Sequence, residues 1–505
     1  MMHSTRLRKS RGSTSSCESG LEGDKDRATD IIGTEGNRVT FRRERDSMGT
    51  IEVPEDVHWG AQTQRSLANF EIGEERMPPP LIHAYGLIKQ AAARVNERLT
   101  DLSAEKTKWI MRAAEEVARG DLDAHFPLRV WQTGSGTQSN MNCNEVVAHR
   151  ANELAGLDPE DANAIHPNDD VNRSQSTNDT FPTAMHLSVA LAIRDELEPA
   201  LDDLCSTLDR KRAEYAEVSK IGRTHLQDAT PLTLGQEIGG WLGQIRVARR
   251  ALEGCVPLLY ELAAGGTAVG TGMNSPQGFD VAIAASLAEK TGLPLVSAPD
   301  KFAALAGHEA ISAVSGALST LAGALFKIAG DVALLASGPR CGLGEITIPA
   351  NEPGSSIMPG KVNPTQAEAL IMVCLRVFGN HTTVGLAASQ GRFELNVCKP
   401  VIAHCTLQSI RLLGDAARSF DRHCVSGLEP DREVLDDMVE RSLMLVTALA
   451  PHIGYEAASK IAGHAHRERI SLKEAALSLE LVSETDFDRW VRAEDMLGPL
   501  PAEND

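Results

Sequence analysis

The sequence predicts an all-α protein, and three observations support this fold class. Apolar residues recur at helical spacing in several segments, long strand-like alternations are scarce, and aromatic residues make up only 4% of the 505 residues. Hydrophobic residues contribute 42% and charged residues 24%, as is usual for a globular protein in water. A chain of this length suits two or three packed units better than one simple core.

The first clear helical pattern follows Pro182, because proline is frequent in the first turn of a helix. Its apolar positions repeat every four residues, at Met185, Val189, Ile193 and Leu197. We therefore predict an amphipathic helix that begins near Pro182.

A second helix is predicted after Thr233, which has the capping-box spacing to Gln236. The apolar stripe behind this cap consists of Ile238, Trp241, Leu242 and Ile245. A third segment, 310–326, carries no charge and is rich in Ala, Gly and Ser. That composition favours a helix packed closely inside a bundle over a membrane span.

The net charge of −19 bears on the possible partners. An acidic surface repels nucleic acid and anionic membranes, so we expect neither, and an anionic substrate needs a local cluster of donors. The cysteines are scattered without a C-x-x-C pair, which indicates a reduced, cytosol-like compartment. We find no metal-ligating pattern and expect neither a metal nor a cofactor.

The N-terminal segment allows two interpretations. Four basic residues lie among Ser and Thr before the first acidic residue, Glu18, which resembles a weak transit peptide. However, the segment has almost no apolar residue for the second face of an amphipathic helix, so we favour a disordered extension over 1–39. We therefore expect a cytoplasmic protein, with the mitochondrial matrix as the alternative.

Polar residues gather in four separated segments. The first, 133–142, combines glycines, which let a ligand approach the backbone, with hydroxyl and amide donors. The second, 166–179, places Ser, Thr and Asn before the helix predicted from Pro182, whose electropositive N-terminus suits a carboxylate. Taken alone, either segment is more often a turn or a helix cap.

The third segment, 222–229, contains His225, the candidate for proton transfer, although a histidine beside a threonine is more often structural. The fourth, 354–364, is too rich in Gly and Pro for a regular helix or strand. It nevertheless holds two hydroxyls, a fixed cation and an amide. A loop with so many polar functional groups is more often a functional site than a simple connection between helices.

The fourth segment resembles the signature loop of the fumarase/aspartase superfamily, G-S-S-x-M-P-x-K-x-N. The flanking runs 336–345, 351–353 and 364–370 narrow the resemblance to the class II fumarases, which are metal-independent. The resemblance covers nearly the whole chain, from Phe41 to Leu497.

This resemblance implies three helical domains with a long five-helix bundle in the centre. It also implies a homotetramer with a twenty-helix core, whose active sites draw residues from more than one subunit. On this chain the domains would be 40–175, 176–431 and 432–505, after the extension 1–39. The implied reaction is the reversible hydration of fumarate to (S)-malate through an aci-carboxylate carbanion, a step of the tricarboxylic acid cycle.

The resemblance further implies roles for single residues. Ser355 would take the proton if Lys361 and backbone N–H groups stabilise its oxyanion, since a serine hydroxyl is otherwise too weak an acid. His225, polarised by Glu368, would activate or protonate the water. Thr224 offers a further neutral donor. The residues implied to surround the substrate are Ser135, Gly136, Thr137, Ser176, Thr177, Asn178, Ser356, Lys361, Val362 and Asn363. A second, peripheral dicarboxylate site would consist of His166, Pro167, Asn168 and Asp169.

Two other functions stay open. Thr177 favours an aspartate ammonia-lyase of the same superfamily, because many fumarases have Ser there. Gln138, Ser139 and the runs 181–186 and 229–231 match fumarases instead. A non-enzymatic structural protein, like the lens crystallins related to argininosuccinate lyase, is disfavoured because the positions for base, acid and anion binding are all occupied.

Overall fold

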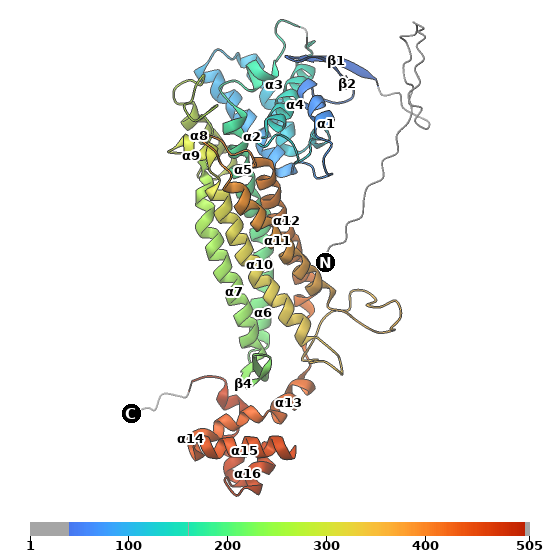
Figure 1. Ribbon diagram of the computed structural model, residues 1–505, viewed down its shortest axis with the longest axis vertical. Coiled ribbons are helices and arrows are strands. Elements are labelled where there is room, and N and C mark those ends of the chain that lie inside the picture. The colour runs from blue at the N-terminus through green and yellow to red at the C-terminus, as the bar shows by residue number, and fades with distance from the viewer. Residues whose placement is uncertain (1–39, 160, 500–505) are drawn as a thin grey trace, which may run out of the picture. The chain divides into compact units, whose positions relative to one another are not determined.

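Helices dominate the part of the chain that the structure describes, residues 40–159 and 161–499 of a computed structural model (Figure 1). This confirms the predicted all-α class. Residues 41 onward belong to one compact unit, so their internal packing positions the polar segments. The disordered extension predicted for 1–39 lies outside the described residues.

The N-terminal part begins with an antiparallel pair of strands, β1 (Phe41–Asp46) and β2 (Gly49–Pro54). Its helices are α1 (Ala61–Asn69), α2 (Pro79–Leu99), α3 (Ala104–Arg119), η1 (Asp123–His125), α4 (Thr137–Ala155) and the π-helical turn η2 (Pro167–Val171). No side chain from its own cap residue holds the start of α1. Instead, the carboxylate of Glu145 on α4 accepts hydrogen bonds from the backbone N–H groups of Gly60, Gln62 and Thr63. These bonds satisfy donors at the helix start that lack partners within the helix.

The central part is a bundle of long helices (Figure 1). Its members are α5 (Thr177–Ala192) with its continuations η3 (Ile193–Leu197) and α6 (Glu198–Glu214), α7 (Leu234–Cys255), α10 (Glu309–Leu335), α11 (Thr365–Ala388) and α12 (Lys399–His423). Each packs on the next around a ring, α6 on α7, α7 on α10, α10 on α11, α11 on α12 and α12 on α6. Both predicted apolar stripes, at 185–197 and 238–245, are buried in this bundle.

The helix predicted from Pro182 starts earlier than expected. It begins at Thr177, and Pro182 lies inside it. The reason is a capping box, in which the side chains of Ser176 and Asp179 each accept a bond from the other's backbone. Ser176, Thr177 and Asn178 therefore form the helix N-terminus rather than a loop before it. The capping box predicted at Thr233 and Gln236 is confirmed.

Two bundle helices, α10 and α11, are long and apolar enough to cross a membrane by length and composition alone. In the structure they pack against each other, α10 also against α7 and α11 also against α12. The segment 310–326 is thus a bundle helix, as its content of small residues predicts.

Shorter elements connect and cap the bundle. A hairpin of β3 (Ser219–Thr224) and β4 (Gln227–Thr233) precedes α7. The remaining elements before residue 432 are η4 (Val256–Tyr260), β5 (Glu261–Leu262), α8 (Phe279–Thr291), β6 (Val296–Ser297), α9 (Lys301–Ala306), β7 (Ile346–Thr347), η5 (Val425–Gly427) and β8 (Glu429–Pro430). The C-terminal helices are α13 (Arg432–Arg441), η6 (Leu443–Leu449), α14 (Ala450–Ile453), α15 (Tyr455–Glu468), α16 (Leu472–Ser478), α17 (Glu484–Trp490) and η7 (Ala493–Met496). Most of these C-terminal helices surround a small apolar core of their own.

Candidate active site

The first polar segment forms the loop before α4 and the first turn of that helix. Gly136 caps the helix with a φ of 80°, a left-handed conformation that glycine adopts readily. A Cβ at Gly136 would lie 2.0 Å from the ring of Phe181, and one at Gly134 would lie 1.5 Å from the carbonyl oxygen of Val397. Side chains are therefore excluded at both positions by the packing of the loop against α5 and the segment before α12.

The second segment is held by a loop that follows β5. The amide of Asn178 donates to the carbonyl oxygen of Ala268 at 2.8 Å. The buried carboxylate of Asp179 accepts from the backbone N–H groups of Gly265 and Thr267, at 2.9 and 3.0 Å. Burial raises the pKa of Asp179, and these bonds oppose that rise because they stabilise the charged form.

Lys89, which the sequence analysis missed, joins the first two segments. Its ammonium lies on α2 and donates to Asn140 at 2.9 Å, Asn172 at 3.2 Å and Gln175 at 3.0 Å. The side chain is fully buried, and this burial lowers the pKa of Lys89 to about 8. The sequence feature that could have identified Lys89 is a lysine among the apolar residues of a helix, because burying an unpaired charge there would be costly.

The third segment forms the tip of the hairpin β3–β4. His225 and Leu226 both have positive φ values, 55° and 60°, which is the backbone of a tight two-residue turn. The side chain of His225 is exposed. Below the tip, the buried carboxylate of Glu345 pairs with Lys220 and with Arg223, so an ion-pair cluster anchors this hairpin.

The fourth segment is a closed loop before α11. The backbone N–H of Gly354 donates to the carbonyl oxygen of Lys361 at 3.0 Å, and the Asn363 amide donates to the carbonyl oxygen of Gly354 at 2.6 Å. The hydroxyl oxygen of Ser355 accepts from the backbone N–H groups of Ile357 and Met358, at 3.2 and 2.9 Å. These two donors would stabilise negative charge on that oxygen.

Within one chain the four segments do not meet. The hairpin with His225 precedes α7, whereas Gly265, which holds the second segment, follows it. The 22 residues of α7 span about 33 Å at the usual helical rise. Figure 1 shows β4 and the α8–α9 region at opposite ends of this helix. The structure therefore unites the first and second segments but separates them from His225.

Two further expected residues have simple positions. Glu368 lies exposed in the first turn of α11, with no side-chain bond to His225 among the described residues. The residues of the expected second dicarboxylate site form an exposed turn at the start of η2. In this turn the backbone N–H of Asp169 donates to Nδ1 of His166 at 3.2 Å.

Comparison with known proteins agrees with this fold. The family model described as "Lyase" matches residues 49–379, and the model described as "Fumarase C C-terminus" matches residues 445–498. The class II fumarate hydratase of Pseudomonas syringae is 59% identical, covering 90% of this chain and 98% of that protein. The mitochondrial fumarate hydratase 1 of Arabidopsis thaliana is 56% identical, covering 91% of this chain and 94% of that protein.

Solved structures show the same relationship. The crystal structure of class II fumarase from Schistosoma mansoni superposes with a TM-score of 0.88 at 46% identity, covering 90% of this chain and 99% of that one. An all-α lyase fold with a polar loop before a bundle helix thus defines the class of this protein. The chain belongs to the class II fumarases of the fumarase/aspartase superfamily.

Proposed function

We propose that this protein catalyses the reversible hydration of fumarate to (S)-malate, and that it serves the tricarboxylic acid cycle. The observation that carries the chemistry is the loop 354–364. It presents the Ser355 hydroxyl to two backbone N–H groups, and Lys361 lies in the same short loop. The names of the similar proteins support this reaction.

In the dehydration direction, the Ser355 oxyanion removes the proton next to one carboxylate of malate. The electron pair of that C–H bond spreads into the carboxylate and forms the aci-carboxylate dianion. Lys361 and the neutral donors of the first two segments stabilise this charge. The C–O bond then breaks as His225, polarised by Glu368, protonates the departing hydroxyl, which leaves as water. Hydration follows the same steps in reverse.

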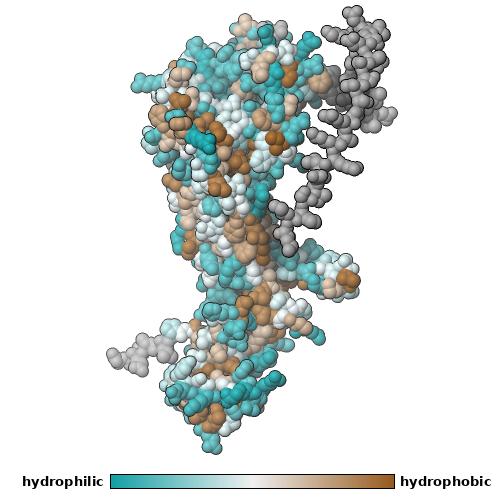
Figure 2. Space-filling model, in the orientation of Figure 1, coloured by the Kyte–Doolittle hydropathy of each residue, from teal (hydrophilic) through white to brown (hydrophobic). Residues whose placement is uncertain are grey.

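We further propose a homotetramer with composite active sites. One chain holds its segments at opposite ends of α7, so a complete site requires segments from different copies. Exposed apolar residues support such an assembly, including Val247, Met372, Leu375 and Leu386, which are between 54% and 65% exposed. They belong to α7 and α11, and Figure 2 shows apolar surface along the bundle. Exposed apolar surface on a protein marks candidate interaction sites.

The same proposal covers the domain limits, the binding residues and the location. We assign domains to 40–175, 176–431 and 432–505, and a cytoplasmic location. The substrate would lie among the residues named for it above, and His166 to Asp169 would hold a second dicarboxylate. Among the described residues, no group of three or more His, Cys, Asp or Glu side chains could hold a metal ion.

The ultraviolet absorbance of fumarate provides the test, since hydration removes the conjugated double bond. Purified protein should consume fumarate and form malate, with full rate after exhaustive chelation. Ammonia should add no rate. Formation of aspartate only with ammonia would show an ammonia-lyase, and absence of turnover in either assay would favour a structural role.

A further inference from the structure

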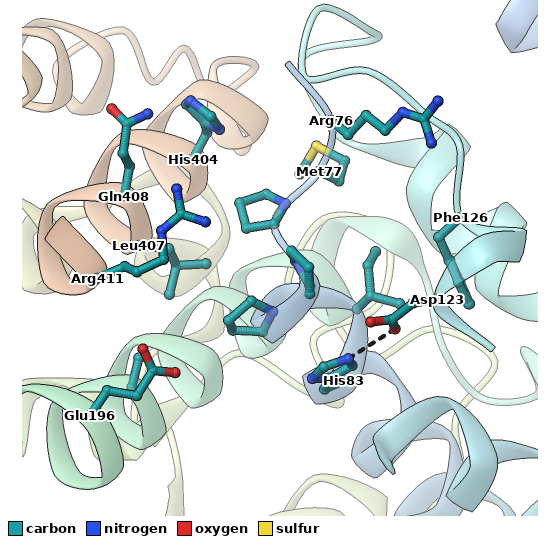
Figure 3. A pocket seen from close by; sticks show the side chains of 15 residues that line it. Arg76, Met77, His83, Asp123, Phe126, Glu196, His404, Leu407, Gln408 and Arg411 are labelled. Carbon is teal, nitrogen blue, oxygen red and sulfur yellow. Dashed lines mark hydrogen bonds and ion pairs between the residues drawn. The ribbon is translucent and has the colours of Figure 1, made fainter. Parts of the chain in front are cut away.

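A cavity of about 560 Å³ lies between the start of α2 and the middle of α12 (Figure 3). None of the residues that line it belongs to the four polar segments. Its volume falls within the range of about 300–1,000 Å³ that is typical of small-molecule sites. The proposed reaction leaves this cavity without a role.

One side of the cavity is apolar. Buried side chains of Met77, Ile82 and Phe126 line it, together with the prolines at 78–80. Proline and aromatic rings present rigid surfaces that lose little conformational entropy when a ligand covers them. This wall suits the aromatic or branched aliphatic part of a small molecule.

Two opposite charges face the other side. Arg411 on α12 and Glu196 on η3 both line the cavity, and neither side chain has an ion pair or hydrogen bond among the described residues. The helical segments that carry them pack together, because a Cβ at Gly414, three residues after Arg411 on α12, would be 3.4 Å from the backbone carbonyl oxygen of Glu196. In the same region, Asp123 is already paired with His83 at 2.9 Å.

His404 adds a second donor beside Arg411. It lies two turns before Arg411 on α12, and Figure 3 shows both side chains on the same side of the cavity. Its Nδ1 atom is buried without a hydrogen-bond partner among the described residues. Because Nδ1 is enclosed by protein, the atom of His404 that can reach a ligand in the cavity is Nε2, which donates a hydrogen bond when it carries the ring proton. Arg411 and His404 together can therefore bind one carboxylate.

We infer that this cavity binds an α-amino acid with a large apolar side chain. Its carboxylate would pair with Arg411 and His404, its ammonium with Glu196, and its side chain would cover the apolar wall. A simple organic anion would leave Glu196 facing it without a partner. An amine would likewise leave Arg411 without a partner. A zwitterion satisfies both groups, and the net charge of −19 would not oppose its approach as it would an anion.

Three probes separate the parts of this inference: L-phenylalanine, 3-phenylpropanoate, which lacks the ammonium, and 2-phenylethylamine, which lacks the carboxylate. Calorimetric titration of the intact protein should show L-phenylalanine as the tightest ligand. Arg411→Gln should weaken L-phenylalanine and 3-phenylpropanoate by about tenfold, as expected for one charge-assisted hydrogen bond. Glu196→Gln should weaken L-phenylalanine and 2-phenylethylamine but leave 3-phenylpropanoate unchanged.

Arg422 supplies the matched control, because it is an exposed arginine in the last turn of the same helix and outside the cavity. Arg422→Gln should bind L-phenylalanine like the wild type. Three results would overturn the inference: no binding of either L-phenylalanine or L-leucine, equal affinity in all variants, or displacement of L-phenylalanine by succinate. The last would place the ligand in a dicarboxylate site. Binding is measured without turnover, so failure of the proposed reaction would not affect this test.

Discussion

Lys220 and Glu345 form an ion pair, with 3.1 Å between Nζ and Oε2, in which neither side chain is more than 1% exposed. Arg223 binds the other carboxylate oxygen of Glu345 at 2.5 Å. This cluster connects the hairpin that carries His225 to the segment leading into the loop of Ser355. Two expected catalytic groups therefore depend on one buried carboxylate.

Glu345→Gln should reduce both stability and turnover. The amide keeps the shape but leaves Arg223 without its carboxylate, whereas Lys220 keeps its second partner, Glu237. Loss of one partner of a buried pair costs about 3–5 kcal/mol. Thermal unfolding and steady-state kinetics will measure the effect. Glu352→Gln is the control, because Glu352 is an exposed carboxylate in the same region. Equal behaviour of the two variants would show that the cluster does not anchor the hairpin.

Ser355→Ala should lower kcat by about 10²–10⁴-fold, the usual contribution of a positioned acid or base, with little change in substrate binding. The hydroxyl is proposed to act on the proton in the transition state, so its loss affects the rate. Circular dichroism and inhibitor titration will check folding and affinity. Near-normal turnover would refute Ser355 as the base, and His225 would become the leading candidate.

Lys361→Met should reduce turnover and also weaken the affinity for dicarboxylate inhibitors. Lys361 is proposed to pair with a substrate carboxylate as well as with the developing charge, and such a bond contributes roughly 1.5–3 kcal/mol. Kinetics and inhibitor binding, compared with Ser355→Ala, separate the two roles. If Lys361→Met lowered kcat but left inhibitor affinity unchanged, the proposed pairing of Lys361 with a substrate carboxylate would be wrong.

Mixing two inactive variants tests the composite site. Ser355→Ala and Asn178→Ala alter groups at opposite ends of the bundle, so tetramers that combine both chains should contain some sites with neither change. Co-expression should restore part of the activity, whereas a mixture kept under conditions without subunit exchange should stay inactive. No recovery in proven mixed tetramers would contradict sites built from several chains.

Stability should fall as the pH is lowered from 6.5 to about 4, partly because of His58. Burial lowers the pKa of His58 to about 4 from the usual 6.5, with further lowering by His125 and His149. Its Nδ1 lies 2.9 Å from Nδ1 of His149. The unfolded chain therefore binds the proton at higher pH than the folded chain. As a result, the free energy of unfolding decreases as the pH falls through this window.

The His58→Asn variant should consequently lose less thermal stability than the wild type between these pH values. His466, an exposed histidine on α15, provides the control, and His466→Asn should keep the wild-type slope. If thermal stability depended on pH equally in all three proteins, His58 and its neighbours His125 and His149 would not account for the loss of stability.

Much of the proposed site can be picked out from the sequence because its residues lie in short contiguous runs. The loop 354–364 is recognisable from its own composition, and the stripes at 185–197 and 238–245 repeat at helical spacing. Lys89 was missed because its three amide partners come from segments distant in sequence. The hairpin tip at His225 was missed because it lacks the Gly and Asn that usually mark positive φ.

The sequence by itself determined the helical class, the buried faces of the bundle helices, the four polar segments and the family. These depend on local periodicity and on contiguous residue patterns. Only the tertiary structure decided that α5 begins at Thr177, that Lys89 joins two segments, and that α7 separates His225 from Asn178. Those facts depend on which distant groups satisfy buried charges and backbone donors, and a linear pattern does not contain that information.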